Sequence, residues 1–295
     1  MAIISFSRQV AAWGDEVAAS LAEKLNYKFV KRTDIEKQIV ELGFPKEKIP
    51  TYDERKPGFF ASFASVRDEY LNYVQYALLS AAKDNNAVII GRGAFSIFEK
   101  MENHVAVRLV ADENTRIERL KTEFNWNEKQ AKQRINESDV NRDGFHKNFF
   151  NVDVKDSSNY HMILNTGKMN VDFAAELVAH YVKANISQED EIKGHKKIQE
   201  YLKAQTLVNK LVFEEKIDIK FIHAEINDNE LILQGVTESP MLIDKAVRFA
   251  SELYPEYKKD FMSRYDELEI ELATLDKEFQ NIKLSQKEVS FVSVT

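Results

Sequence analysis

The chain has 295 residues, of which 44% are hydrophobic and 30% are charged, so it can form one large domain or two ordinary ones. No apolar run approaches the roughly 18 residues that a membrane helix needs, and the first residues lack the basic region and long apolar stretch of a signal peptide. The absence of cysteine excludes disulfides, thiolate metal sites and a cysteine nucleophile. We therefore expect a cytoplasmic protein that has no membrane partner.

The charge is unevenly distributed. Through Ser187, 26 Lys and Arg residues balance 26 Asp and Glu residues, so the formal net charge of −7 lies in the remaining C-terminal third. An acidic segment of this kind repels the phosphates of nucleic acids and of anionic lipids. We expect neither to be a partner.

Apolar runs and helical stretches alternate along the first 185 residues. The predicted strands are residues 3–6, 87–90, 105–110 and 162–164. A helix with Val17, Leu21 and Leu25 on one face follows the first strand, and further helices are predicted at 66–84, 113–123, 127–137 and 171–184. Asn127 and Gln130 have the spacing of a capping box. This order predicts an α/β fold, a parallel sheet with helices on both faces.

The pattern changes near residue 190. Residues 195–214 read as an amphipathic helix, and alternation through Ile217, Ile219 and Phe221, then Ala224 and Ile226, predicts a strand. The turn residues 227–229 lead into a return strand at 231–236. A helix at 240–253, a charged helix at 256–283 and an alternating apolar end at 289–294 complete the prediction. We predict a first domain at 1–187 and a small α+β domain at 195–295.

Four segments of the first domain carry a family resemblance. They are residues 4–9 with 16–25, residues 53–60, residues 89–94, and residues 116–119 continuing through 139–147 to 158–166. Their order and spacing over about 180 residues resemble the cytidylate-kinase-like family of P-loop kinases, with a nucleoside monophosphate kinase fold and a helical lid. The resemblance implies ATP-dependent phosphoryl transfer to a nucleoside monophosphate, with Mg²⁺.

The resemblance also implies roles for particular residues. Arg92, between Gly91 and Gly93, stands where these kinases carry an arginine that binds the monophosphate, and Arg142 and Lys147 match the lid that closes over the phosphates. Arg8 and Gly14 remain from the phosphate loop, and Arg116 is a further candidate for phosphate binding. The physical chemistry agrees, because open α/β sheets bind ligands at strand C-termini and arginine grips phosphate with two donors. The alternatives are a turn with a surface arginine and a solvated charged helix face. The sequence predicts no metal ligands.

The phosphate loop departs from the family. A P-loop reads G-x-x-x-x-G-K-[ST], and the family replaces it with Ser-Arg-x-x-Gly-Ser-Gly-Gly. Here residues 7–14 place Ala11 and Trp13 at two of the three glycine positions, and Asp15 stands where the family usually has a basic residue. Ala and Trp disfavour positive φ, and Asp15 would repel phosphate at a helix N-terminus. We expect Trp13 to be an ordinary buried aromatic residue that closes a loop without a ligand.

The C-terminal domain resembles a BON domain in its strand at 231–236, its Ser239-Pro240 and its helix with Ala246 and Ala250. Such a domain implies binding or assembly, and we expect self-association through it. Three functions remain open: an active cytidylate-type kinase, a pseudokinase that senses a nucleotide or other small anion, and an assembly protein without a ligand. The degenerate loop favours the second, with the active kinase as the alternative. ATP and Mg²⁺ would be cofactors only of an active enzyme.

Overall fold

The computed structural model describes residues 1–51, 64–237 and 239–263. The chain divides into two compact units, Met1–Thr206 and Leu207–Thr295, and the division falls within one helix, α8 (Gln188–Asn209). The domain limits at 187 and 195 stay a prediction. None of the described helices is long and apolar enough to cross a membrane.

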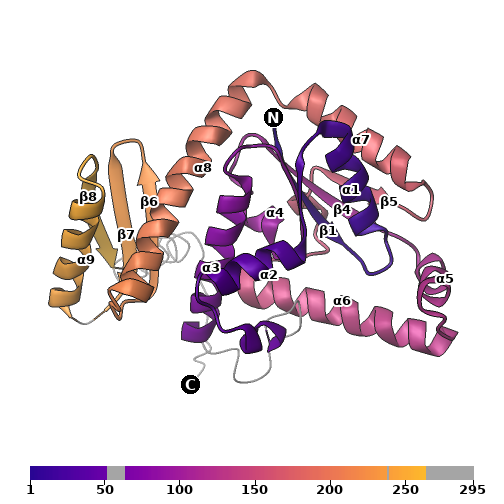
Figure 1. Cartoon of the computed structure of the whole chain (residues 1–295), viewed down its shortest axis with the longest axis horizontal. Coiled ribbons are helices and arrows are strands. Elements are labelled where there is room, and N and C mark those ends of the chain that lie inside the picture. Colours follow the sequence, from indigo (N-terminus) through magenta and orange to yellow (C-terminus); the bar gives the residue numbers. More distant parts are fainter. Residues whose placement is uncertain (52–63, 238, 264–295) are drawn as a thin grey trace, which may run out of the picture. The chain divides into compact units, whose positions relative to one another are not determined.

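Unit 1 is built on a five-stranded parallel sheet with the order β2-β3-β1-β4-β5. Its strands β1, β4 and β5 are labelled in Figure 1. The strands are β1 (Ile3–Arg8), β2 (Lys28–Val30), β3 (Ala87–Ile90), β4 (His104–Val110) and β5 (Met162–Asn165). The helices are α1 (Gly14–Leu25), α2 (Arg32–Glu41), α3 (Ala64–Ala82), α4 (Ala94–Ile97), α5 (Glu113–Phe124), α6 (Glu128–Phe150) and α7 (Val171–Asn185). The predicted fold class is confirmed, and β2, α2 and α4 are additions to the predicted elements.

Alternation along β1 and β4 gives the two faces of the sheet different chemistry. On one face, Ile4 and Phe6 of β1 and Val105, Val107 and Leu109 of β4 form a core with α1 and α7. On the other face, the same strands present polar side chains that are buried: Ser5, Ser7, His104 and Arg108. Ser5 pairs with His104 and Ser7 with Arg108 through side-chain hydrogen bonds. This second face is polar although it is inside the protein, and it carries the candidate site.

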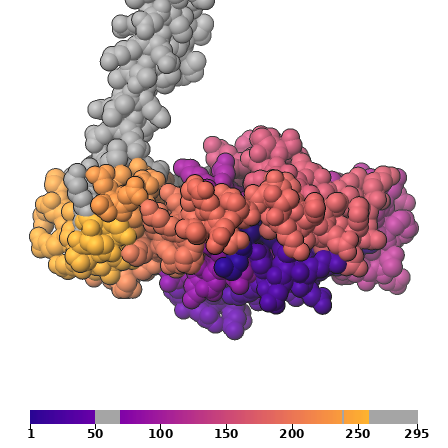
Figure 2. All heavy atoms as spheres, turned by 90° about the horizontal axis from the view of Figure 1, so that it is seen from above, coloured from indigo at the N-terminus to yellow at the C-terminus, as the bar shows by residue number. Residues whose placement is uncertain are grey.

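The first part of α8 belongs to unit 1. It packs against residues that lie just before β1, β3 and β4 in the sequence. The amino group of Met1 forms an ion pair with Glu191, whose carbonyl accepts a hydrogen bond from Asn85 Nδ2 at 3.2 Å. A Cβ on Gly194 would lie 1.9 Å from Asn103 Oδ1, so only glycine allows this approach. Figure 2 shows α7 and this part of α8 covering much of one face of unit 1.

The lid segment is longer and more regular than expected. Residues 127–137 are predicted as a helix, whereas α6 continues to Phe150 through the predicted lid residues. The predicted capping box is confirmed: Asn127 Oδ1 accepts from the Gln130 amide at 2.9 Å, and Gln130 Oε1 accepts from the Asn127 amide at 2.9 Å. The helix ends at Asn151, which adopts a left-handed conformation with φ of 54°.

Unit 2 contains a three-stranded sheet in the order β6-β7-β8 and the helix α9 (Pro240–Leu253). β6 (Lys220–Asn227) and β7 (Glu230–Val236) form the predicted antiparallel hairpin, and β8 (Lys258–Ser263) runs parallel to β7. The α8 helix ends at Asn209 and is followed by a π-helical turn at Lys210–Glu214.

Two predictions for unit 2 are wrong. The charged helix predicted from residue 256 is a strand at Lys258–Ser263, because pairing with β7 overrides the local helical pattern. Phe221 does not share the buried face of Ile217 and Ile219: it has φ of 52° and is 37% exposed, because the pairing register shifts between Lys220 and His223. The remainder of the predicted helix at 256–283, the apolar end at 289–294 and the family segment at 53–60 lie outside the described residues.

Candidate functional site

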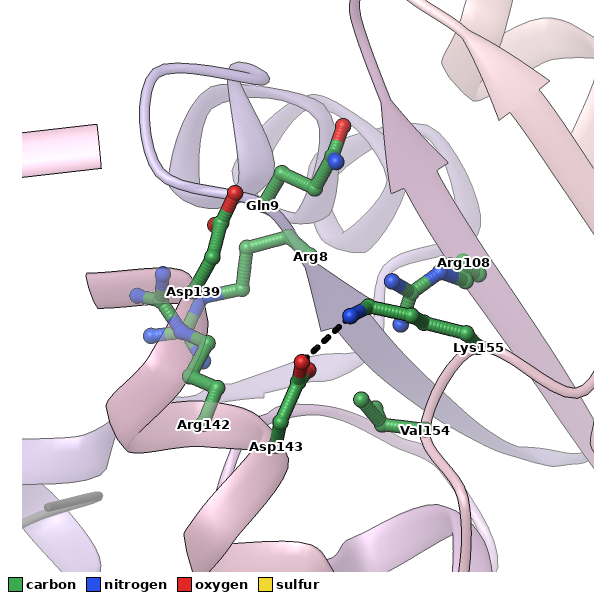
Figure 3. A pocket seen from close by; sticks show the side chains of 8 residues that line it. All are labelled: Arg8, Gln9, Arg108, Asp139, Arg142, Asp143, Val154 and Lys155. Carbon is green, nitrogen blue, oxygen red and sulfur yellow. Dashed lines mark ion pairs between the residues drawn. The ribbon is translucent and has the colours of Figure 1, made fainter. Parts of the chain in front are cut away.

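A small pocket of about 20 Å³ opens at the carboxyl ends of β1 and β4, under α6 (Figure 3). Charged side chains dominate its lining, which consists of Arg8, Gln9, Arg108, Asp139, Arg142, Asp143, Val154 and Lys155. After β1 the chain continues toward β2, and after β4 it continues toward β5 on the opposite side. Open α/β sheets bind ligands at such a reversal of strand order. The pocket therefore lies where this fold places ligands.

The two carboxylates of the pocket already have cationic partners. Asp139 receives three hydrogen bonds from Arg116, at 3.2, 3.0 and 2.8 Å. Burial nevertheless raises the pKa of Asp139, against the lowering effect of Arg116 and Arg142. Asp143 Oδ2 lies 2.5 Å from Lys155 Nζ, an ion pair drawn in Figure 3. Both carboxylates of the pocket are therefore already engaged with cationic side chains.

Arg108 is the most unusual of those cations. Its side chain comes from the middle of a buried strand and is only 7% exposed. Its Nη1 donates to Ser7 Oγ at 3.3 Å and approaches Tyr160 Oη at 3.5 Å, and its guanidinium lies 5.7 Å from the centre of the Tyr160 ring. Across the described residues it forms no ion pair with a carboxylate. A buried charge without a counter-ion is costly, so this geometry suits an anionic ligand.

The two predicted lid residues, Arg142 and Lys147, lie on different faces of α6. Arg142 lines the pocket and donates to Ser138 Oγ. Lys147 is exposed and is not part of the pocket lining. Five residues on an α-helix correspond to about 140° of rotation, so the two side chains leave different faces of α6. Arg116 holds Asp139 and thereby ties α5 to α6, and its side chain is buried.

The Gly91-Arg92-Gly93 turn is left-handed throughout, with φ of 84°, 55° and 73°. A Cβ on Gly93 would lie 2.2 Å from the Phe150 ring, which explains the second glycine. Arg92 is completely buried: Nη1 donates to Tyr70 Oη at 2.9 Å, and Nη2 is paired with Glu36. Arg92, which the resemblance predicts to bind the monophosphate, is therefore buried inside unit 1. Its phosphate-binding role stays a prediction.

The degenerate loop keeps a backbone typical of glycine without the glycines. Ala11 has φ of 59° and Trp13 has φ of 54°. Left-handed backbone costs a residue with a side chain about 1–2 kcal/mol. Arg119 stabilises the loop, because its guanidinium stacks 3.3 Å from the centre of the half-buried Trp13 ring and donates to the Ala11 carbonyl at 2.8 Å. Thr166 Oγ1 donates to the Ala12 carbonyl at 3.1 Å.

Gly14 permits a close approach within this loop. A Cβ there would lie 2.6 Å from Cγ of Arg8 and 3.2 Å from Cδ1 of Ile90. The glycine therefore lets the Arg8 side chain cross the start of α1 on its way to the pocket. Arg8 and Gly14 act as a pair in this structure.

The loop does not fit a magnesium–triphosphate complex. Two of its amide groups, Gln9 and Ala12, donate to the carbonyls of Leu109 and Gln9 at 3.0 and 3.3 Å. The exposed Asp15 lies in the first turn of α1. Among the described residues no three His, Cys, Asp or Glu side chains gather as a metal site. The paired amides of the loop and the carboxylate of Asp15 therefore oppose a bound triphosphate.

The comparisons with known proteins agree with this architecture. Residues 3–168 match the cytidylate kinase-like family. The chain belongs to this family. No curated protein matches the chain.

Several solved structures resemble the family part of the chain. An uncharacterized protein from Eubacterium ventriosum ATCC 27560 is 20% identical, with 62% of this chain and 99% of that chain covered and a TM-score of 0.49. Shikimate kinase from Bacteroides thetaiotaomicron is 16% identical, with 62% and 98% covered and a TM-score of 0.39. Shikimate kinase from Acinetobacter baumannii, in complex with shikimate, is 14% identical, with 63% and 94% covered and a TM-score of 0.36.

The strain in the loop gives a stability test. Replacing Ala11 by Gly should raise the free energy of unfolding by about 1 kcal/mol, because glycine adopts positive φ without penalty. Ala12→Gly is the matched control, since Ala12 is fully buried and has no positive φ. It should lower stability by a similar amount. Urea unfolding of both variants measures the effect, and a loss in Ala11→Gly equal to that of the control would contradict the strain.

Proposed function

We propose that this protein binds the phosphate group of a nucleotide, or a similar small anion, in the pocket between β1, β4 and α6, and that it transfers phosphoryl groups weakly or not at all. Family membership supports a kinase-like fold that is suited to nucleotides. The loop chemistry argues against catalysis, and the cations of the pocket argue for a retained ligand.

One observation carries the binding proposal: the buried guanidinium of Arg108, whose hydrogen-bond partners Ser7 and Tyr160 are neutral. Proteins rarely bury arginine without a counter-charge. Arg8 and Arg142 line the same pocket, so an anion there would meet three guanidinium groups. The pocket is small in this conformation, so the ligand would enter with a movement of the lid helix α6.

Arg92 is a second residue that a phosphate group could reach. A monophosphate reaching Arg92 would have to displace Glu36, which now neutralises it. This competition would allow the protein to sense its nucleotide or other small anion, because ligand binding would then change the contacts of α2. The change at α2 would then be passed to a BON-like second domain. The protein would also self-associate through this domain.

The test compares Arg108→Met with Arg134→Met, which removes an exposed arginine of α6. The probes are CMP, inorganic phosphate and sulfate, and the readout is the free energy of unfolding with and without each probe. At a ligand concentration near 100 Kd, the unchanged protein and Arg134→Met should gain about 2.7 kcal/mol, whereas Arg108→Met should gain little.

The same experiment has a second readout. Without ligand, Arg108→Met should be as stable as the unchanged protein or about 1 kcal/mol more stable, because the substitution removes an unpaired buried charge. Equal ligand-induced gains in both variants, or no gain with any anion, would refute the binding proposal.

A further inference from the structure

A second pocket, of about 250 Å³, lies on the same face of the sheet near the amino end of β4. The side chains that matter for its chemistry are Phe95, Glu99, His104, Tyr160 and His161. It shares no lining residue with the pocket that contains Arg108. Its lining includes residues 158–161 of a family segment, but none of the site residues predicted from the sequence.

His104 brings an unsatisfied polar atom to this pocket. The side chain is 2% exposed, and its Nε2 lies 2.7 Å from Ser5 Oγ. Its Nδ1 has no hydrogen-bond partner within the part of the chain that the structure describes. Native proteins rarely leave such an atom unpaired, since an unmade buried hydrogen bond costs about 1–3 kcal/mol. A bound molecule that pairs with Nδ1 would recover this free energy.

His161 adds a hydrogen-bond donor. Its Nδ1 accepts a hydrogen bond from the Ala106 amide at 3.0 Å, so in the neutral ring the proton is on Nε2. Burial lowers the pKa of His161, and burial together with the neighbouring His161 lowers the pKa of His104 to about 3. Both rings are therefore neutral near pH 7. Glu99, which is exposed at the rim, is then the charged side chain of this pocket.

Two aromatic rings in contact with each other form part of the pocket wall. The Phe95 and Tyr160 rings lie with their centroids 5.1 Å apart and tilted by 41°. Aromatic walls with a few polar groups are typical of sites for small organic molecules. The carboxylate of Glu99 and the absence of a cation from the lining disfavour a phosphorylated ligand.

We propose that this second pocket binds a small planar nitrogen heterocycle without a phosphate group, whose ring nitrogens pair with His104 and whose N–H groups face Glu99. The pocket differs from the anion site in charge, lining and ligand class.

Benzimidazole is a suitable probe, because it is flat and has one N–H donor and one ring-nitrogen acceptor. Titration followed by ¹H–¹⁵N NMR of the imidazole nitrogens should shift the resonances of His104 and His161. Calorimetry should give about tenfold weaker binding for Glu99→Gln, since a hydrogen bond to a charged group is lost. Glu102→Gln, an exposed glutamate outside the pocket, is the matched control and should bind as the unchanged protein does.

Three outcomes would overturn the proposal. They are unshifted histidine resonances at saturating benzimidazole, equal affinities of the Glu99→Gln and Glu102→Gln variants, and competition by inorganic phosphate for the same resonances. Because Glu99 is exposed, its substitution leaves the fold intact, and the NMR spectrum of the variant verifies this directly.

Discussion

With ATP and Mg²⁺ as donor and CMP, dCMP or UMP as acceptor, the protein should turn over far more slowly than the roughly 1–100 s⁻¹ that is typical of kinases. Phosphoryl transfer depends on positioning and on neutralising charge, and loss of one such group can cost about 10³–10⁵ in rate. In this loop the Gln9 and Ala12 amides bond to backbone carbonyls, and Asp15 adds a negative charge. No Walker lysine is present in the sequence.

The side chain of Arg119 also holds the loop in this conformation. Arg119 binds the Ala11 carbonyl and the Trp13 ring, and it donates to the Thr166 carbonyl at 2.6 Å. Burial lowers the pKa of Arg119, but the guanidinium remains charged. To admit a triphosphate, the loop would have to lose these contacts and reorient its amides. The missing elements act on the same step, so one remaining cation cannot compensate for them.

The measurement is phosphate transfer with each acceptor, beside a variant carrying Ala11→Gly, Trp13→Gly and Asp15→Arg. Glu23→Arg makes the same charge change on an exposed position of α1 and serves as the control. We expect no ordinary turnover in the unchanged protein or in the control. Turnover of about 1–100 s⁻¹ in the unchanged protein would show that it is an active kinase.

The second large effect concerns Glu36. Its replacement by Ala should lower the free energy of unfolding by about 3–5 kcal/mol, because it removes a carboxylate that pairs with the fully buried Arg92. Glu36 also lies 3.3 Å from Arg32 Nε, an ion pair at the surface that contributes little by itself. The loss should therefore come from the buried partner.

The control is Glu41→Ala on the same helix, which breaks an exposed pair with Lys37 at 3.8 Å. It should change stability by less than about 1 kcal/mol. Urea unfolding at pH 7 measures both variants, and the double variant Glu36→Ala, Arg92→Met should recover part of the loss. A loss in Glu36→Ala no larger than in the control would show that Arg92 does not depend on this carboxylate.

Much of unit 1 can be read from the sequence because its strands are continuous apolar runs. The run at 87–90 is a strand over those residues, and the capping box at Asn127 marks the start of α6. The three-residue β2 has no such signal, since Lys28 is exposed and the strand lies at the sheet edge. Polar residues 139–147 conceal the continuation of α6, which contains Gly144 and still remains helical.

The candidate site was harder to predict than the fold. Arg108 is part of a run that reads as an ordinary apolar strand, and only the charge inside that run hints at a ligand. Lys155 belongs to the pocket because the segment after α6 folds back toward Asp143, a tertiary contact without a local pattern. Likewise, the helix predicted from the sequence ends at residue 137, so the spacing of Arg142 and Lys147 could not be converted into positions on different faces of α6.

The unpaired charge of Arg108 also bears on how much protein a cell would contain. A protein that is less stable without its anion spends more time unfolded, and unfolded chains are what proteases degrade. Anion binding at the pocket would then lengthen the lifetime of the protein. The amount of protein in the cell would then rise and fall with the concentration of its ligand.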